Sequence, residues 1–252
     1  MIKPEFIAHR GYTRHYPENT LIGIEAALDA GARYIEIDVQ LTADLVPVLF
    51  HDNDLYRVTG WSGDINDTQF TQLKNLTAGE PLRFGNRYQN VRIPSLAELV
   101  ELLRHRPDAR TFVEIKTESI DRFGADKVTQ IVLDAVSPLK DHCIPISYND
   151  ASLRYARKSA ACKIGWILKT YNENSHGTAK DLRPDYLFCN YTKLPPPPVP
   201  LWAGSWRWAL YEITDPALAL TLADRGVEMI ETMEIGEMLQ YPSIQDRLSD
   251  AD

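Results

Sequence analysis

The chain has 252 residues, of which 44% are hydrophobic and 25% charged, and its formal net charge is -8 at pH 7. This composition is that of a globular protein with enough apolar residues for a sizeable core. The acidic balance and the lack of a strong basic cluster argue against a nucleic-acid-binding protein. The length fits one large α/β domain or two small domains.

Neither the cysteines nor the N-terminus indicates a secreted or membrane protein. Cys143, Cys162 and Cys189 are far apart and form no CxxC pair, so we expect neither a disulfide framework nor a zinc site. The opening residues MIKPEFIAHR lack the apolar core of a signal peptide, and the sequence has no apolar run of about 18 residues that would span a membrane. We therefore expect a cytoplasmic protein without a membrane span.

Short β-rich segments alternate with helical patterns from the start of the chain. FIAHR, residues 6–10, is a strand candidate, and the amphipathic stretch 19–31 predicts a helix. Asn19 or Thr20 can cap the start of that helix, and Gly31 can end it. Two more strand candidates follow, YIEIDVQ at 34–40 and VPVLFHD at 46–52.

A polar stretch at about 53–94 interrupts this alternation before a second clear helix begins. SLAELVELLRHR, residues 95–106, has the apolar spacing of an amphipathic helix. Ser95 stands at its N-cap, and Glu98 stands at the position that completes a capping box.

The alternation resumes in the second half of the chain. We predict strands at 111–117, 143–149, 163–169, 185–190, 207–213 and 227–232, and helices near 125–136, 151–160 and 215–225. The run KLPPPPVP, residues 193–200, can form neither a helix interior nor a central strand, so it predicts a rigid surface loop.

These strand candidates, which mostly alternate with helices, indicate an α/β fold. The arrangement and length favour a TIM (β/α)8 barrel formed by residues 1–252 as a single domain. A doubly wound open sheet is the alternative. No GxGxxG motif follows the first strand, which weakens a dinucleotide-binding interpretation.

The strand candidate at 34–40 carries two acids, Glu36 and Asp38, between isoleucines. Side chains alternate between the two faces of a strand, so both acids point the same way. Read alone, such a pair is more typical of a solvated strand face than of a site.

Polar residues at other early strand ends change that interpretation. His9 and Arg10 end the first strand, His51 and Asp52 end VPVLFHD, and TFVEIKT carries Glu114 and Lys116 on one face. In a parallel barrel these strand ends meet at the C-terminal rim, where active sites lie. Strand-borne groups are also held more firmly than groups on loops.

Three carboxylates, Glu36, Asp38 and Glu114, would converge in this mouth. Close carboxylates in a low dielectric repel one another unless some are protonated or a cation lies among them. Oxygen-only ligands suit one hard divalent cation, Mg²⁺ or Ca²⁺, better than zinc. Such an ion can polarise a phosphoryl oxygen.

The other mouth residues fit an anionic substrate. Arg10 and Lys116 supply donors for a phosphate group, while His9 and His51 titrate near neutrality. One histidine could activate a nucleophile while the other protonates the leaving alkoxide. Together these groups indicate metal-assisted phosphodiester cleavage.

A set of motifs in the first half resembles the glycerophosphodiester phosphodiesterase family. They are IAHRG, PENT, IEIDVQLT, VPVLFHDNDLYRVTG, IPSLAELVELL and VEIK, in that order and spacing, and they cover residues 6–117 closely. The resemblance implies a TIM barrel with a small insertion after the second strand, which would match residues 53–94. It also implies hydrolysis of glycerophosphodiesters, such as glycerophosphocholine or glycerophosphoethanolamine, to glycerol 3-phosphate and an alcohol.

The resemblance further implies a role for each matching residue. His9 and His51 match the general acid/base pair, Glu36, Asp38 and Glu114 match the divalent-metal ligands, Arg10 and Lys116 match the phosphate-contacting residues, and Glu18 and Asn19 match an EN element of partly structural role. Ca²⁺ and Mg²⁺ are the common ions of the family.

The second half departs from the family pattern. YEIT at 211–214 and GVEMIETM at 226–233 stand where members often have WTVN and GVDGIITD. Tyr211 thus replaces a tryptophan that often lines the glycerol pocket. Glu212 and Glu231 add acids near the rim, and the sequence leaves open which way they face. These departures concern the choice of substrate rather than the reaction.

Two alternatives remain open from the sequence. A lysophospholipase D-like enzyme could hold an acyl chain with the aromatic and proline-rich segment 191–211. A non-catalytic barrel could instead bind phosphodiesters, although two titrating histidines beside a metal site speak against that. The sequence predicts a small-molecule partner and indicates no oligomeric state.

Overall fold

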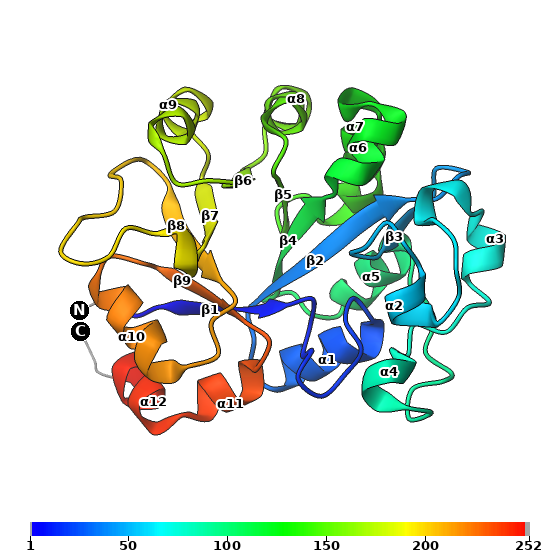
Figure 1. Cartoon of the computed structure of the whole chain (residues 1–252), viewed down its shortest axis with the longest axis horizontal. Coiled ribbons are helices and arrows are strands. Elements are labelled where there is room, and N and C mark those ends of the chain that lie inside the picture. Colours follow the sequence, from blue (N-terminus) through cyan, green and yellow to red (C-terminus); the bar gives the residue numbers. More distant parts are fainter. Residues whose placement is uncertain (1, 250–252) are drawn as a thin grey trace.

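The computed structural model describes residues 2–249, in which eight parallel strands close into a barrel (Figure 1). The strands follow one another around the barrel as β1-β9-β8-β7-β6-β5-β4-β2, and pairing of β1 with β2 closes the ring. The predicted TIM barrel is therefore confirmed, and the open sheet is wrong. The barrel strands are β1 (Glu5–His9), β2 (Tyr34–Leu41), β4 (Arg110–Ile115), β5 (Cys143–Ser147), β6 (Gly165–Ile167), β7 (Tyr186–Asn190), β8 (Arg207–Tyr211) and β9 (Met229–Thr232).

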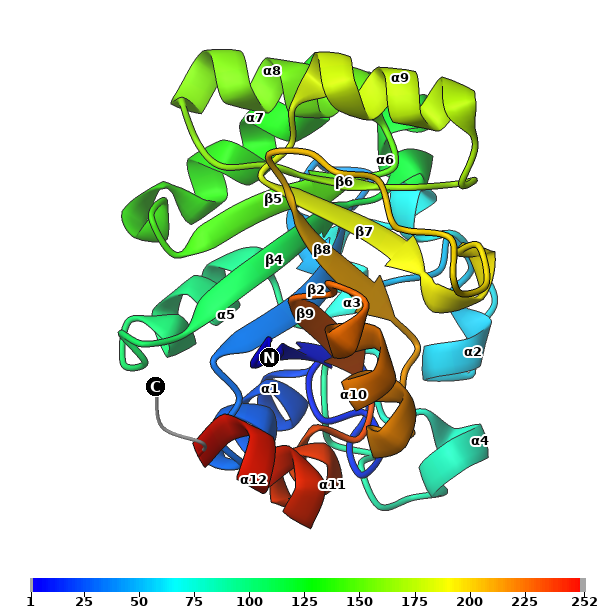
Figure 2. The ribbon, with the colours of Figure 1, turned by 90° about the vertical axis from the view of Figure 1, so that its left-hand side faces the viewer.

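Helices surround the barrel on its outer side (Figure 2). They are α1 (Leu21–Asp29), α5 (Leu96–Leu103), α6 (Thr117–Phe123), α7 (Ala125–Val136), α8 (Asp150–Ala160), α9 (Glu173–Leu182), α10 (Pro216–Asp224), α11 (Ile235–Gln240) and α12 (Pro242–Ser249). None of the helices within residues 2–249 has the length and apolar character needed to cross a membrane.

The predicted helix caps are found at α1 and α5. The Thr20 hydroxyl accepts a hydrogen bond from the Gly23 backbone N–H at 3.3 Å, so Thr20 rather than Asn19 caps α1. Ser95 and Glu98 form the predicted reciprocal capping box of α5. Each cap satisfies backbone N–H groups that the first helical turn leaves unpaired.

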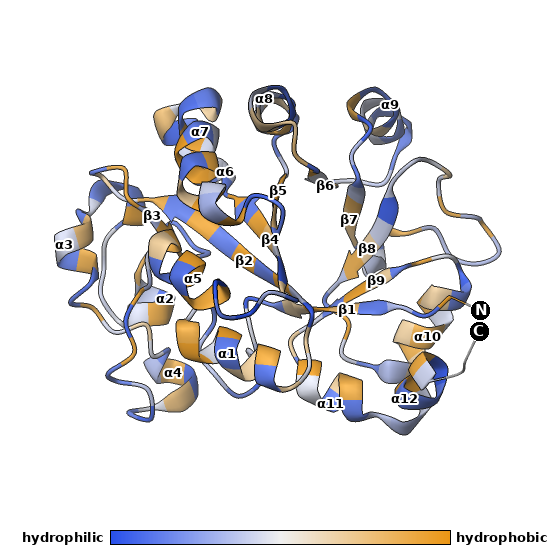
Figure 3. Cartoon of the chain, turned by 180° about the vertical axis from the view of Figure 1, so that it is seen from behind, coloured by the Kyte–Doolittle hydropathy of each residue, from blue (hydrophilic) through white to orange (hydrophobic). Residues whose placement is uncertain are grey.

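Side chains along each strand point alternately to the outside and to the inside of the barrel, and the two sides pack differently. On β2, Ile35, Ile37 and Val39 face outward and pack with α5 and α7, and the alternating bands of this strand are visible in Figure 3. The opposite face of the strands points inward. Below the mouth this interior is apolar and includes Ile7, Phe112, Ile144, Ile146, Ile167, Tyr186, Phe188, Ala209 and Met229.

The strand predicted at 46–52 is shorter and runs the other way. Only Pro47–Leu49 forms a strand, β3, and it pairs antiparallel with the end of β2. The prediction of a strand ending at the barrel rim is therefore wrong for this segment. The physical reason is the short connection at 42–46, because a crossover between parallel strands needs a dozen or more residues.

The chain after β3 forms the insertion between β2 and β4 (Figure 1). It contains α2 (Tyr56–Thr59), the 3-10 helix η1 (Ile65–Asp67), α3 (Phe70–Leu73) and α4 (Pro81–Phe84). These short elements share a small core of their own, with Phe50, Leu55, Ile65 and Leu73 buried in it. The insertion predicted after the second strand is thus present.

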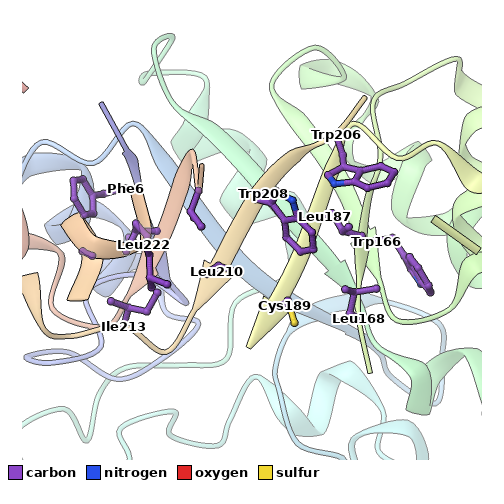
Figure 4. Packing of buried hydrophobic residues seen from close by; sticks show 14 of the residues in the cluster. Phe6, Trp166, Leu168, Leu187, Cys189, Trp206, Trp208, Leu210, Ile213 and Leu222 are labelled. Carbon is purple, nitrogen blue, oxygen red and sulfur yellow. The ribbon is translucent and has the colours of Figure 1, made fainter. Parts of the chain in front are cut away.

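The connection from β7 to β8 contains no α-helix between Asn190 and Arg207, only the short 3-10 helix η3 (Tyr191–Lys193) and the proline-rich loop predicted there. Aromatic packing covers the barrel wall in its place. Trp206 and Trp208 lie against Trp166 and Leu187 on the outer side of the strands (Figure 4). Trp202 stacks on Tyr171 with ring centroids 3.9 Å apart. These tryptophans therefore contribute to packing.

Substitution of Phe112 tests the apolar barrel interior. Phe112 is 0% exposed and contacts the rings of Tyr186 and Phe188, so Phe112→Ala leaves a cavity that its neighbours fill only in part. We expect a loss of about 3–5 kcal/mol in the free energy of unfolding, measured by denaturant titration. Leu82→Ala is the control, because Leu82 is 78% exposed. Equal losses in the two variants would contradict this account of the core.

Candidate active site

A cavity of about 140 Å³ opens at the C-terminal mouth of the barrel. Its apolar floor is formed by Ile146, Ile167 and Phe188. All the predicted site residues except Asp38 line it, namely His9, Arg10, Glu36, His51, Glu114, Lys116 and Tyr211. Asp38 is 1% exposed and contacts two of these lining residues, Arg10 and Lys116.

The pairing register of the strands brings these side chains together. His9 on β1 is the partner of Glu36 on β2, and Asp38 on β2 is the partner of Glu114 on β4. Partners on neighbouring parallel strands point to the same face of a sheet. The site therefore follows directly from the register and from the inward-facing parity of the early strands.

A sharp turn after β1 directs Arg10 into the mouth. Gly11 has φ +90°, and a Cβ there would lie 2.8 Å from the carbonyl carbon of Gly23. Only glycine fits this conformation and this close approach to α1 without strain. The turn leaves the Arg10 backbone N–H 2.9 Å from the carbonyl oxygen of Glu36 and 3.2 Å from its carboxylate.

Asp38 lies at the centre of a network of charges. Its carboxylate contacts Arg10 Nε at 2.9 Å and Lys116 Nζ at 3.2 Å, and Asn19 donates to it at 2.9 Å. Burial alone would raise the pKa of Asp38, but Arg10 and Lys116 outweigh it and hold this pKa well below its usual range. Asp38 is consequently ionised at neutral pH, and Asn19 of the EN element fixes its orientation.

Glu36 and Glu114 are in a different electrostatic state. Burial raises the pKa of Glu36 well above its ordinary value, and the nearby Asp38 carboxylate adds to the rise. Burial also raises the pKa of Glu114, and its contact with Lys116 at 2.9 Å opposes that only in part. These carboxyls therefore gain much from a further positive charge.

The geometry of the three acids fits a hard divalent cation. Oxygen atoms of Glu36, Asp38 and Glu114 lie within 4.8 Å of one another. Glu36 Oε1 is buried and has no hydrogen-bond partner among the described residues. A buried, unpartnered carboxylate oxygen in an oxygen-only donor set suits Mg²⁺ or Ca²⁺.

His9 lies against two carboxylates. Its Nε2 is 3.9 Å from Glu36 Oε2 and 3.5 Å from Glu231 Oε1. Burial and the adjacent Arg10 charge lower the pKa of His9 to about 3. The imidazole is therefore neutral at neutral pH in the ion-free protein.

His51 reaches the same mouth from the insertion side rather than from a barrel strand. The β2–β3 hairpin extends beyond the rim and returns, so that the Phe50 backbone N–H donates to the Asp38 carbonyl at 3.1 Å. Gln40 fixes the next residues by donating to the carbonyl oxygens of His51 and Asp52 at 3.1 and 2.8 Å. Asp52 Oδ1 lies 2.6 Å from His51 Nδ1.

The structure adds residues that the sequence alone did not place. Glu231, on β9, faces into the mouth and is 4% exposed, and burial raises its pKa to about 8. Tyr148, directly after β5, also lines the cavity, with its hydroxyl 3.1 Å from that of Tyr211. Its place at the C-terminal end of a strand is a signal that could have identified it. Glu212 lines the cavity too, with a carboxylate that accepts from Asn190.

Chemically, the mouth combines a cation-attracting group of acids, two basic side chains and two imidazoles above an apolar floor. Such a site can hold a metal ion beside an anionic group and move protons on either side of it. Electrostatic interactions are strong there because Glu36, Asp38, Glu114 and Lys116 are buried.

Comparisons with known proteins identify the family of this chain. A model of the glycerophosphoryl diester phosphodiesterase family matches residues 9–185. A glycerophosphodiester phosphodiesterase of Caldanaerobacter subterraneus is 35% identical over 169 residues, which are 66% of this chain and 67% of that protein. The mouse glycerophosphodiester phosphodiesterase 1 is 45% identical over 100 residues, 39% of this chain but only 30% of the mouse protein.

Solved structures share the fold over nearly the whole chain. A phosphodiesterase of Oleispira antarctica, solved with the product sn-glycerol-3-phosphate, superposes with a TM-score of 0.81 at 24% identity, covering 96% of this chain and 97% of that one. A putative glycerophosphoryl diester phosphodiesterase of Silicibacter pomeroyi gives 0.80 at 21% identity, covering 99% of this chain and 94% of that one. The resemblance seen in the motifs is thereby confirmed, and the chain belongs to the glycerophosphoryl diester phosphodiesterase family.

Proposed function

We propose that this chain hydrolyses glycerophosphodiesters, such as glycerophosphocholine or glycerophosphoethanolamine, to glycerol 3-phosphate and an alcohol. The observation that carries the proposal is the mouth cavity, which joins acids, cations and imidazoles from β1, β2 and β4, from the residues directly after β1 and β4, and from the segment after β3. The family match supports the same reaction class. The Oleispira relative with bound sn-glycerol-3-phosphate supports this product.

Glu36, Asp38 and Glu114 would hold one divalent cation, Mg²⁺ or Ca²⁺. When bound, the ion would polarise a phosphoryl oxygen and offset the negative charge of the acids. Arg10 and Lys116 would contact the other phosphate oxygens, since both side chains line the cavity beside these acids. Arg10 and Lys116 each already contact a carboxylate, and this contact holds their charged groups in place for an incoming anion.

His9 and His51 would move the two protons of the reaction. One imidazole takes a proton from the attacking hydroxyl, of water or of the substrate's own glycerol, while a new P–O bond forms. The other gives a proton to the oxygen of the leaving alcohol as the old P–O bond breaks. Asp52 would hold the His51 ring through Nδ1, leaving Nε2 for the substrate.

Tyr211 would contact the organic part of the substrate from the wall opposite the early strands. It lines the cavity and shares a hydroxyl contact with Tyr148. A tyrosine pair offers hydroxyl groups for hydrogen bonds where a tryptophan would offer apolar surface and one N–H. Polar hydroxyls of a glycerol moiety suit such a wall.

A lysophospholipid substrate has less support from the contacts. Trp202, Trp206 and Trp208 pack on the outer barrel wall, and of the segment 191–211 only Tyr211 lines the mouth cavity. Comparing turnover of glycerophosphocholine with that of lysophosphatidylcholine separates the two substrates. Preference for the lysolipid would favour the alternative. A cytoplasmic location would suit water-soluble substrates and stays a prediction.

Removal of divalent ions should abolish turnover. We expect release of glycerol 3-phosphate from glycerophosphocholine to fall at least about 10²-fold in excess chelator and to return with Mg²⁺ or Ca²⁺, because the acids otherwise repel the phosphate. Asp38→Asn should lose the ion-dependent rate while far-UV circular dichroism stays unchanged. Full activity in chelator would contradict the metal role, and tight ligand binding without turnover in any ion would favour the non-catalytic alternative.

Loss of either imidazole should slow the chemical step. His9→Ala and His51→Ala should each lower kcat at least about 10²-fold, the lower end of what positioned acid-base groups contribute. Stopped assays of glycerol 3-phosphate measure this directly. His105→Ala serves as the control, because His105 is exposed and pairs with Glu101 on α5. A variant of His9 or His51 with more than a third of the wild-type kcat would remove that residue from the mechanism.

Ion affinity should increase with pH. The raised pKa values of Glu36 and Glu114 mean that these carboxyls hold protons in the ion-free protein above the ordinary range for glutamate. A cation must displace these protons, so binding releases protons and tightens as the pH rises above the ordinary titration range of glutamate. Calorimetry in two buffers of different ionisation enthalpy measures both effects. Glu231→Gln should weaken the pH dependence, because Glu231 helps to raise the pKa of Glu36. A pH-independent affinity without proton release would refute the electrostatic description.

A further inference from the structure

Arg57, the second residue of α2, joins two carboxylates from separate parts of the chain. Its NH1 and NH2 donate to the two Glu18 oxygens at 2.9 and 2.7 Å. Its Nε and NH2 donate to the two Asp52 oxygens at 2.6 and 3.0 Å. Glu18 precedes α1 of the barrel, whereas Asp52 begins the insertion. The guanidinium therefore clamps the insertion to the barrel with two bidentate contacts.

This clamp is part of a continuous line of alternating charges. On the barrel side, Glu18 also accepts from Arg10 NH1 at 3.3 Å, and Arg10 Nε lies 2.9 Å from Asp38. On the insertion side, Asp52 lies 2.6 Å from His51 Nδ1. The line thus runs from a proposed metal ligand, Asp38, to a proposed catalytic imidazole.

Burial and geometry distinguish the clamp from an ordinary surface ion pair. The Glu18 side chain is 8% exposed. Burial alone would raise the pKa of Glu18, but the hydrogen bonds and charge of Arg57 lower it, so Glu18 remains ionised. Bidentate arginine–carboxylate contacts fix orientation as well as distance, which isolated exposed pairs do not.

His51 needs such support more than the other mouth residues do. His9, Glu36 and Glu114 stand on barrel strands, while His51 follows β3 outside the parallel ring. Its ring is a third exposed, and its hydrogen-bond partner is the neighbouring Asp52. We propose that Arg57 is a positioning residue, which holds Asp52 against Glu18 and thereby fixes the His51 imidazole over the mouth. This inference rests on the catalytic role proposed for His51.

Arg57→Met tests the clamp, with Arg83→Met as the matched control. Both arginines belong to the insertion, are 42% and 43% exposed and pair with a buried glutamate, Glu18 or Glu80. Only Arg57 contacts Asp52. We expect Arg57→Met to lower kcat for glycerophosphocholine by about 10- to 100-fold, as loss of a supporting contact commonly does. KM should stay within about threefold, because the Arg10–Asp38 contact remains.

Two further measurements separate positioning from a structural effect. Arg57→Lys should give a kcat between those of wild type and Arg57→Met, since an ammonium keeps the charge but cannot form both forks. Adding Arg57→Met to Asp52→Asn should cost little more than Asp52→Asn alone, because both changes interrupt the same contact. Equal kcat in the Arg57→Met and Arg83→Met variants, or full additivity with Asp52→Asn, would overturn the proposal.

A spectroscopic test does not depend on turnover. The long-range ¹H–¹⁵N spectrum of the six imidazoles reports which ring nitrogen carries the proton, and His51→Ala assigns the His51 signals. Arg57→Met should shift the His51 nitrogens, and Arg83→Met should leave them unchanged. Unchanged His51 signals in Arg57→Met would overturn the clamp. If Arg57→Met shifts the His51 signals as expected but the wild-type protein does not hydrolyse the substrate, only the proposed hydrolysis is overturned.

Discussion

Charge balance around Asp38 is the constraint on which the rest of the mouth depends. This carboxylate is 1% exposed and would be unfavourable without partners. Arg10 supplies one partner from directly after β1, Lys116 another from directly after β4, and Asn19 the third from the segment before α1. Each partner is thereby held in a fixed orientation. The contacts that offset the cost of burying the Asp38 charge also hold the side chains of Arg10 and Lys116 around the position proposed for a phosphate.

The barrel converts a simple sequence alternation into this arrangement. On β2, outward isoleucines pack against helices, while inward acids reach the mouth. Pairing of His9 with Glu36 and of Asp38 with Glu114 then sets the distances between the groups. The apolar interior below them, centred on Phe112, raises the electrostatic cost of every unpaired charge.

Much of this could be predicted from residues that lie on regular strands. Side chains alternate along a strand, so Glu36 and Asp38 of YIEIDVQ were predicted to share one face. The polar residues at the ends of neighbouring strands predicted that this face points into the barrel mouth. The prediction that the segment 46–52 is a strand ending at the barrel rim is wrong. The short connection at 42–46 is typical of a hairpin. His51 reaches the predicted place because the hairpin returns to the rim, not because a barrel strand ends there.

Other features depend on tertiary contacts that no local pattern contains. Glu228 and Glu231 have opposite parity in the strand predicted at 227–232, so the sequence alone could not decide which acid faces the mouth. The helix α9 is polar around most of its surface and was not predicted. Arg57 reads as an ordinary surface arginine, and its partner Glu18 lies 39 residues earlier. Long-range ion pairs of this kind become visible only when the insertion is placed against the barrel.

The central claim is that Glu36, Asp38 and Glu114 form one divalent-cation site beside the two proposed catalytic histidines. A crystal structure with Mn²⁺, an oxygen-seeking ion with a strong anomalous signal, tests it most directly. The account predicts one anomalous peak in the mouth within about 2.5 Å of oxygen atoms from these three carboxylates. A mouth without a peak at saturating Mn²⁺, or a peak bound by His9 and Glu231 instead, would contradict it.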